Sequence, residues 1–194
     1  MPGLGAPAVS RIRQALERLG VKLLEHRVVT AITSEGVETE HGLIPADFVT
    51  GAAGARPYLW IAKSGLEVEE GFIKVGPDLR SSDPAVFAVG DCAHLTHDPR
   101  PKAGVYAVRE APILFNNLRA ALGAGTSHKY RPQRDYLKLI SLGRKAALGE
   151  RFGLTLSGAL MWRWKDHIDR KFMDRFRDLP KMQQPPLPRL HADG

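Results

Sequence analysis

Apolar residues recur along this chain with two periods, one typical of helices and one typical of strands. Helical spacing, bounded by capping residues and glycines, predicts helices over 10–19, 103–122 and 160–179. Short apolar runs between turn residues predict the strands. The predicted strands are 21–24, 28–32, a hairpin over 36–44, a buried strand over 47–53, a short strand within 65–74, a buried strand over 86–89, and a C-terminal pair, 136–147 and 152–156, joined at Gly149. This mixture predicts an α/β fold.

The segment SSDPAVFAVGD (81–91) carries the most informative functional pattern. Its apolar run leads into Gly90-Asp91, and a small-residue loop and a helix follow. Glycine lets a ligand approach the backbone closely, and a carboxylate accepts hydrogen bonds from hydroxyl groups. The pattern therefore indicates a site for a polyhydroxyl ligand. The alternative is an ordinary strand-to-loop turn with a capping aspartate.

Composition restricts the class of protein. The chain has 194 residues, of which 43% are apolar and 25% charged, as in soluble globular domains, and its net charge is +7. The positive excess lies mainly between residues 129 and 177, which could face nucleic acid, an anionic bilayer or solvent. The lone Cys92 excludes an internal disulfide and fits a reducing compartment. Neither a membrane span nor a secretion signal is present, so we expect a cytoplasmic protein.

Several segments, in this order, resemble the C-terminal half of type II NADH dehydrogenases, within the FAD-dependent pyridine nucleotide-disulfide oxidoreductase superfamily. They are GAAGARP (51–57), GFIKVGPDLRS (71–81), VFAVGDCA (86–93) and PKAGVYAVREAPILFNNL (101–118). A narrower resemblance comes from YLKLISLGRKAALGERFGL (136–154) followed by WRWKDHIDRKFM (162–173). These stretches are similar to the flavoprotein part that some bacteria fuse to selenide, water dikinase.

The resemblance implies a partial two-dinucleotide-binding-domain flavoprotein fold, with incomplete Rossmann-like FAD and NAD domains and a C-terminal β-hairpin plus amphipathic helix. It implies that residues 1–60 are the end of the NAD(P)-binding domain and 61–127 the end of the FAD-binding domain. Residues 128–180 would form the hairpin and helix module, and 181–194 a flexible tail. The implied cofactor is FAD and the implied substrate is NAD(P)H, in an NAD(P)H dehydrogenase.

The resemblance also implies which residues bind these groups. Gly90 and Asp91 would contact the ribityl and pyrophosphate region of FAD. The start of the following helix would face the flavin, and a glycine-rich stretch would line the nicotinamide side of the NAD cleft. The helix residues are Lys102, Ala103, Gly104 and Val105, and the stretch is Gly51, Ala52, Ala53 and Gly54. Because hydride transfer is flavin chemistry, we nominate no catalytic side chain.

Superfamily members bind FAD and NAD through two Gly-x-Gly-x-x-Gly turns, which this sequence lacks. Gly3-Leu-Gly5 does not have the third glycine. We therefore expect the chain to begin inside the NAD domain, to be inactive alone, and to need a missing N-terminal half or a second copy as partner. A non-catalytic dimerisation or binding remnant is the alternative function.

Other functions fit the residues less well. Quinone-reducing members usually carry Ala-Gln and a further Gln where this chain has Gly104, Val105 and Glu110 or Arg109. Cys92 alone argues against sulfide:quinone reduction. The metal-type residues of the loop 92–98 are too close together for an ordinary zinc site, so no metal is expected. A basic nucleic-acid module lacks clustered aromatic residues on strands. Within 160–179, one apolar stripe recurs at helical spacing, formed by Trp164, Ile168, Phe172, Phe176 and Leu179. This stripe predicts either docking on protein or contact with a bilayer surface.

Overall fold

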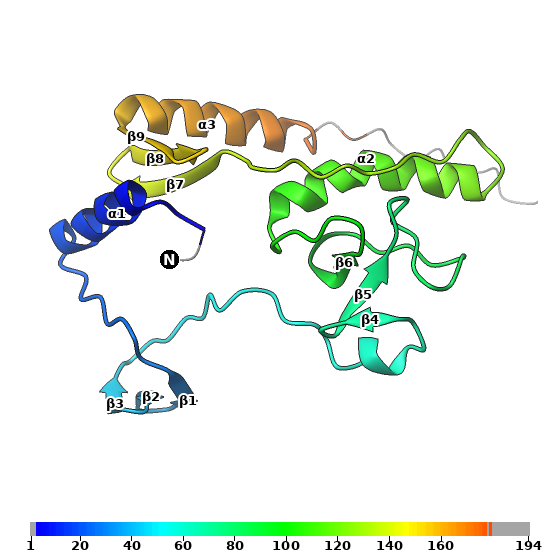
Figure 1. Ribbon diagram of the computed structural model, residues 1–194. Coiled ribbons are helices and arrows are strands. Elements are labelled where there is room, and N and C mark those ends of the chain that lie inside the picture. The colour runs from blue at the N-terminus through cyan, green and yellow to red at the C-terminus, as the bar shows by residue number, and fades with distance from the viewer. Residues whose placement is uncertain (1–2, 178, 180–194) are drawn as a thin grey trace, which may run out of the picture. The chain divides into compact units, whose positions relative to one another are not determined.

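The computed structural model describes residues 3–177 and 179 of the chain (Figure 1). It divides into two compact units, one formed by the described residues of 1–23 and 137–194, the other by 24–136. Each unit combines helices with a three-stranded sheet, and the second contains two such sheets. The mixed α/β class predicted from the sequence is confirmed.

The first sheet of unit 24–136 is an antiparallel meander. Its strands are β1 (Val29–Thr33), β2 (Gly36–Thr39) and β3 (Gly42–Pro45), paired in the order β1-β2-β3. The predicted hairpin over 36–44 is therefore confirmed. Gly36 is required at the start of β2, because a Cβ there would lie 2.2 Å from the carbonyl oxygen of Ile44.

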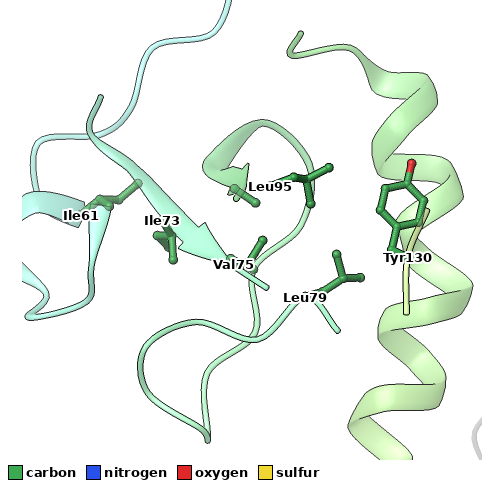
Figure 2. Close-up of a cluster of buried hydrophobic side chains, with 8 residues drawn as sticks. Ile61, Ile73, Val75, Leu79, Leu95 and Tyr130 are labelled. Carbon is green, nitrogen blue, oxygen red and sulfur yellow. The ribbon is translucent and has the colours of Figure 1, made fainter. Parts of the chain in front are cut away.

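The second sheet of this unit contains a parallel pair. β4 (Val68–Glu69) pairs antiparallel with β5 (Phe72–Val75), and β5 pairs parallel with β6 (Ala93–Leu95). Apolar side chains from these strands and the loops around them form the core of the unit, drawn in Figure 2. The buried members are Ile61, Ile73, Val75, Leu79, Ala88, Ala93, Leu95 and Tyr130.

The helix α2 (Gly104–Ala121) packs against this core through Ile113 and Leu114, as the helix prediction for 103–122 anticipated. Asn117, only 1% exposed, fastens the helix to two loops. Its amide nitrogen donates to the carbonyl oxygens of Asp78 (2.7 Å) and His128 (2.9 Å), and its amide oxygen accepts from the backbone N–H of His128 (2.7 Å).

Three predicted strands are wrong. Residues 86–89 form only an isolated bridge, Arg80 with Phe87, and the parallel strand comes later, at β6. Residues 47–53 are coil, with Phe48 85% exposed, and residues 21–24 are coil as well. A buried parallel strand needs hydrogen-bonded neighbours. Among the described residues none pairs with 47–53, so an apolar run alone does not become a strand there.

The other unit packs two helices with a second meander. α1 (Ala6–Arg18) starts earlier than predicted, because Pro7 suits the first turn of a helix. The strands are β7 (Lys138–Gly143), β8 (Ala146–Arg151) and β9 (Leu154–Gly158), which correct the predicted pair to three strands. The predicted joint, Gly149, lies inside β8, where a Cβ would meet the sulfur of Met161 at 2.7 Å.

The C-terminal helix α3 (Ala159–Asp174) ends before the predicted limit of 179. The predicted apolar stripe is exposed: Trp164, Ile168, Phe172, Phe176 and Leu179 are all at least 37% accessible. Within the described part of the chain, no helix combines the length and apolar character that crossing a bilayer requires. The tail assigned to 181–194 lies outside the described residues.

Candidate functional site

A cavity of about 380 Å³ opens beside the parallel strand pair in unit 24–136. The wall comes from the start of β5 and the turn before it, the turn before β6, β6 itself, the loop after β6 and the first turns of α2. The lining residues are Ala55, Glu70, Phe72, Gly90, Asp91, Ala93, His94, Leu95, Pro99, Arg100, Pro101, Lys102, Ala103, Tyr106 and Glu110. The cavity thus combines apolar surface with several charged groups.

Gly90 and Asp91 form a tight turn at the wall of this cavity. Residues Gly90–Cys92 make a single turn of 3-10 helix directly before β6. Gly90 has φ +68°, which disfavours any residue with a side chain, and a Cβ there would lie 3.2 Å from the Cβ of Ala107. Asp91 is exposed and lines the cavity. The turn therefore presents one carboxylate to the cavity.

Glu110 holds this turn from the side of α2. Its carboxylate Oε2 accepts a hydrogen bond from the backbone N–H of Gly90 at 2.6 Å, and the residue is 3% exposed. A buried carboxylate is unfavourable unless it is hydrogen-bonded, so this contact satisfies a group that would otherwise destabilise the unit.

Lys102 supplies a partly buried cation in the same wall. Its Nζ donates a hydrogen bond to the carbonyl oxygen of Ala93 and lies 4.2 Å from the centroid of the Phe72 ring. Burial lowers the pKa of Lys102 below its ordinary value, while the negative charge of Asp91 and Glu110 opposes that shift. The lysine is thus held in the cavity wall and does not extend into solvent.

The start of α2 borders the cavity. Ala103 is extended (φ −151°, ψ 136°) and Gly104 begins the helix without a side-chain cap. Ala103 lines the cavity, whereas Gly104 and Val105, the first residues of the helix, are not among its lining residues. Helix N-termini carry partial positive charge and free N–H donors, so this end of α2 favours a negatively charged or hydrogen-bond-accepting ligand group.

The structure places only some of the predicted site residues at the cavity. It brings Gly90, Asp91, Lys102 and Ala103 together there. Gly51, Ala52, Ala53 and Gly54 are exposed coil and are not among its lining residues. Their neighbour Ala55 does line it.

Sequence reasoning missed several residues that shape the cavity. The sequence singles out Glu110 only as a position where quinone-reducing members carry a glutamine, yet Glu110 lies on the buried face of α2 with Tyr106 and Asn117. A carboxylate on a helical stripe of buried residues is the signal that could have revealed it. Phe72 carries no such local signal, because only the strand pairing brings it to Lys102.

Comparison with known proteins agrees with this fold. The sequence model of the family described as pyridine nucleotide-disulphide oxidoreductase matches residues 1–111. The nitric oxide reductase FlRd-NAD(+) reductase of Klebsiella pneumoniae is 34% identical over 94 residues, 45% of this chain and 25% of that protein. Monodehydroascorbate reductase 3 of Arabidopsis thaliana is 33% identical over 128 residues, 61% of this chain and 29% of that protein. The chain therefore matches about a quarter of the length of these relatives.

Solved structures show the same fold. A ferredoxin reductase from Rhodopseudomonas palustris has a TM-score of 0.55 at 19% identity, covering 79% of this chain and 46% of that one. An NAD-dependent persulfide reductase from A. fulgidus has a TM-score of 0.58 at 22% identity, covering 76% and 28%. The fold is thus part of the two-dinucleotide-binding flavoprotein fold. With the match to residues 1–111, the chain belongs to the pyridine nucleotide-disulphide oxidoreductase family, whose members are FAD- and NAD(P)H-dependent oxidoreductases.

The residues of the cavity fit a flavin dinucleotide. The Asp91 carboxylate lines the cavity and can accept hydrogen bonds from hydroxyl groups, and Lys102 and Ala103, the residues directly before α2, line the same wall. Hydroxyl acceptor, cation and backbone donors are the groups that a sugar-alcohol chain and its neighbouring ring system require.

Proposed function

We propose that this chain provides the flavin-facing part of an FAD-dependent NAD(P)H dehydrogenase. The observation that carries the proposal is the Gly90-Asp91 turn, which lies at the wall of the cavity directly before the strand that pairs parallel with β5. A carboxylate at such a turn suits the ribityl hydroxyls of FAD. The family to which the chain belongs supports FAD as the ligand.

Each residue of the cavity has a distinct task in this proposal. Asp91 accepts hydrogen bonds from the ribityl hydroxyls, and Gly90, whose missing Cβ would meet Ala107, lets the turn pack against α2. Backbone donors at Gly104 and Val105, together with the helix dipole of α2, stabilise negative charge on the flavin ring edge. Lys102 adds positive charge to the same wall. When bound, FAD supplies the hydride-accepting ring, and the protein positions and polarises it.

This chain offers fewer candidate contacts for NAD(P)H than for FAD, because residues 51–54 do not line the cavity. The stretch Gly51–Gly54 is proposed to border the nicotinamide, as the resemblance implies. The sequence contains no Gly-x-Gly-x-x-Gly turn, so we propose that the pyrophosphate contacts of both dinucleotides come from another segment or a second copy.

Titration of FAD by flavin fluorescence tests the proposal. Asp91→Ala removes the proposed ribityl acceptor, and Asp47→Ala removes an exposed carboxylate that is not among the cavity's lining residues. We expect Asp91→Ala to weaken FAD binding about tenfold or more, because hydrogen bonds to charged groups contribute about 1.5–3 kcal/mol. Asp47→Ala should bind as the wild type does. Equal affinity of both variants and the wild type would show that Asp91 does not hold the flavin.

A further inference from the structure

Glu110 is the buried carboxylate nearest to the turn that presents Asp91. Among the described residues, its Oε2 is the one acceptor for the Gly90 backbone N–H, at 2.6 Å. Glu110 belongs to α2 and Gly90 to the turn before β6, so the bond joins two elements that are 20 residues apart in sequence.

The hydrogen bond between Glu110 and Gly90 affects the direction in which the Asp91 side chain points. Gly90 has φ +68°, a left-handed conformation that glycine adopts without strain but is also free to leave, so a neighbouring contact is needed to hold it. The N–H of Gly90 lies at the start of the 3-10 turn, and Asp91 is the next residue. A rotation of the Gly90 peptide would therefore swing the Asp91 carboxylate away from the cavity.

The chemistry of the contact explains why a carboxylate is present on this face of α2. A glutamate that is 3% exposed is unfavourable unless its oxygens are hydrogen-bonded, and a charged acceptor makes a stronger bond to a backbone N–H than a neutral one. Packing alone would favour an apolar residue between Tyr106 and Ile113. The burial of Glu110 thus has a cost that its contact with the turn helps to offset, together with the nearby positive charge of Lys102.

We propose that Glu110 is a positioning residue that fixes the Gly90 peptide and thereby the direction in which Asp91 enters the cavity. This inference rests on the proposed function, because the presented carboxylate is the one that would hold the ribityl chain. Glu110 acts through Gly90 and does not itself need to touch the flavin.

Three variants of the whole chain test this role. Glu110→Gln keeps an acceptor oxygen for the Gly90 N–H, and Glu110→Leu removes the acceptor at similar volume. Asn117→Leu is the matched control, since Asn117 is buried on the same helix but bonds the loops at Asp78 and His128. It destabilises the fold without touching the Gly90 turn.

Two measurements are made on each variant. The first is amide hydrogen exchange of Gly90, observed by nuclear magnetic resonance and divided by the exchange rate of the β5 amides to cancel changes in global stability. The second is the dissociation constant of FAD for the folded protein, from fluorescence titration. The first measurement needs no ligand, so it decides the role of Glu110 even if flavin binding is weak.

We expect Glu110→Leu to raise the relative exchange of Gly90 about tenfold or more and to weaken FAD binding by a similar factor. Glu110→Gln should stay within about threefold of the wild type in both measurements, because a neutral acceptor is weaker but present. Asn117→Leu should lower stability and leave both relative values unchanged.

Different results would contradict the positioning role of Glu110 and the proposed function. Unchanged relative exchange at Gly90 in Glu110→Leu overturns the positioning role, whatever happens to flavin. Faster exchange with unchanged FAD affinity also overturns it, because the turn would then not serve the ligand. If Asp91→Ala binds FAD as tightly as the wild type does, the proposed function fails, while the exchange data still show whether Glu110 fixes the turn.

Discussion

Gly90 lies directly against Ala107 of α2: a Cβ built on the glycine would lie 3.2 Å from the Cβ of the alanine. The turn and the helix are therefore in contact through two of the smallest side chains available. Because Gly90 also has φ +68°, both backbone conformation and space oppose a side chain at this position.

This contact predicts the effect of Gly90→Ala. We expect the free energy of unfolding of unit 24–136 to fall by about 1–2 kcal/mol, since alanine is strained at positive φ and crowds Ala107. Urea unfolding measures the change. Gly104→Ala is the control, because a Cβ at Gly104 meets nothing within 4 Å and its φ is not positive. A loss of stability no greater than that of the control would contradict the strained contact.

A second glycine contact predicts a compensated double variant. A Cβ on Gly149 in β8 would lie 2.7 Å from the sulfur of Met161 on α3 and 3.3 Å from a methyl carbon of Leu139. We expect Gly149→Ala to destabilise this unit by about 1–3 kcal/mol through overpacking. Adding Met161→Ala should recover part of the loss, since the two positions are in contact. Unfolding followed by the fluorescence of Trp162 and Trp164 reports on this unit. Strictly additive effects would contradict the contact.

Tyr130 predicts a loss of stability in alkaline solution. Burial raises the pKa of Tyr130 to about 12, and its hydroxyl has no hydrogen-bond partner among the described residues. The unfolded chain loses this proton near pH 10 and the folded chain near pH 12, so stability is full below pH 10 and falls between pH 10 and 12. We expect this contribution, about 2 kcal/mol, to be absent in Tyr130→Phe.

The comparison of unfolding free energies between pH 9 and 12 tests this expectation. Below pH 10, Tyr130→Phe should be at least as stable as the wild type, because it removes an unpaired buried hydroxyl. Lys102 has a lowered pKa and acts in the opposite direction, gaining stability as pH rises toward 10.5, but it is present in both proteins and cancels in the difference. Parallel curves for the two proteins across this range would refute the raised pKa of Tyr130.

The exposed stripe of α3 predicts weak binding to lipid. Three of its cationic side chains are paired with acids nearby: Lys165 with Asp169, Arg170 with Asp166, and Arg177 with Asp174. These pairs reduce the attraction to anionic lipid, so we propose docking on protein as the main role of residues 160–179. The wild type should sediment weakly with phosphatidylserine-containing vesicles, and a variant with the three acids changed to Asn should sediment more strongly. Strong, salt-sensitive binding of the wild type would instead support a bilayer contact.

Local pattern determines several parts of this protein. α2 and the β1–β2–β3 meander follow from helical spacing and from turn residues at short range, so their positions can be predicted without knowing what they pack against. The Gly90-Asp91 pair is likewise visible in the sequence, because its chemistry depends on two adjacent residue types. Membership of the flavoprotein family also follows from such short motifs.

Pairing between distant segments decides the rest. The apolar runs 47–53 and 86–89 resemble strands in sequence, but a strand forms only where another segment supplies its hydrogen bonds. β6 forms because β5 supplies those hydrogen bonds. The sequence around Gly149 predicts a turn, but in the structure Gly149 lies within β8. Glu110 acquires its task only when α2 packs against the turn at Gly90. The sequence thus determines the local elements and the reactive residue types, while tertiary contacts, which depend on residues far apart in the chain, decide which of them meet at the cavity.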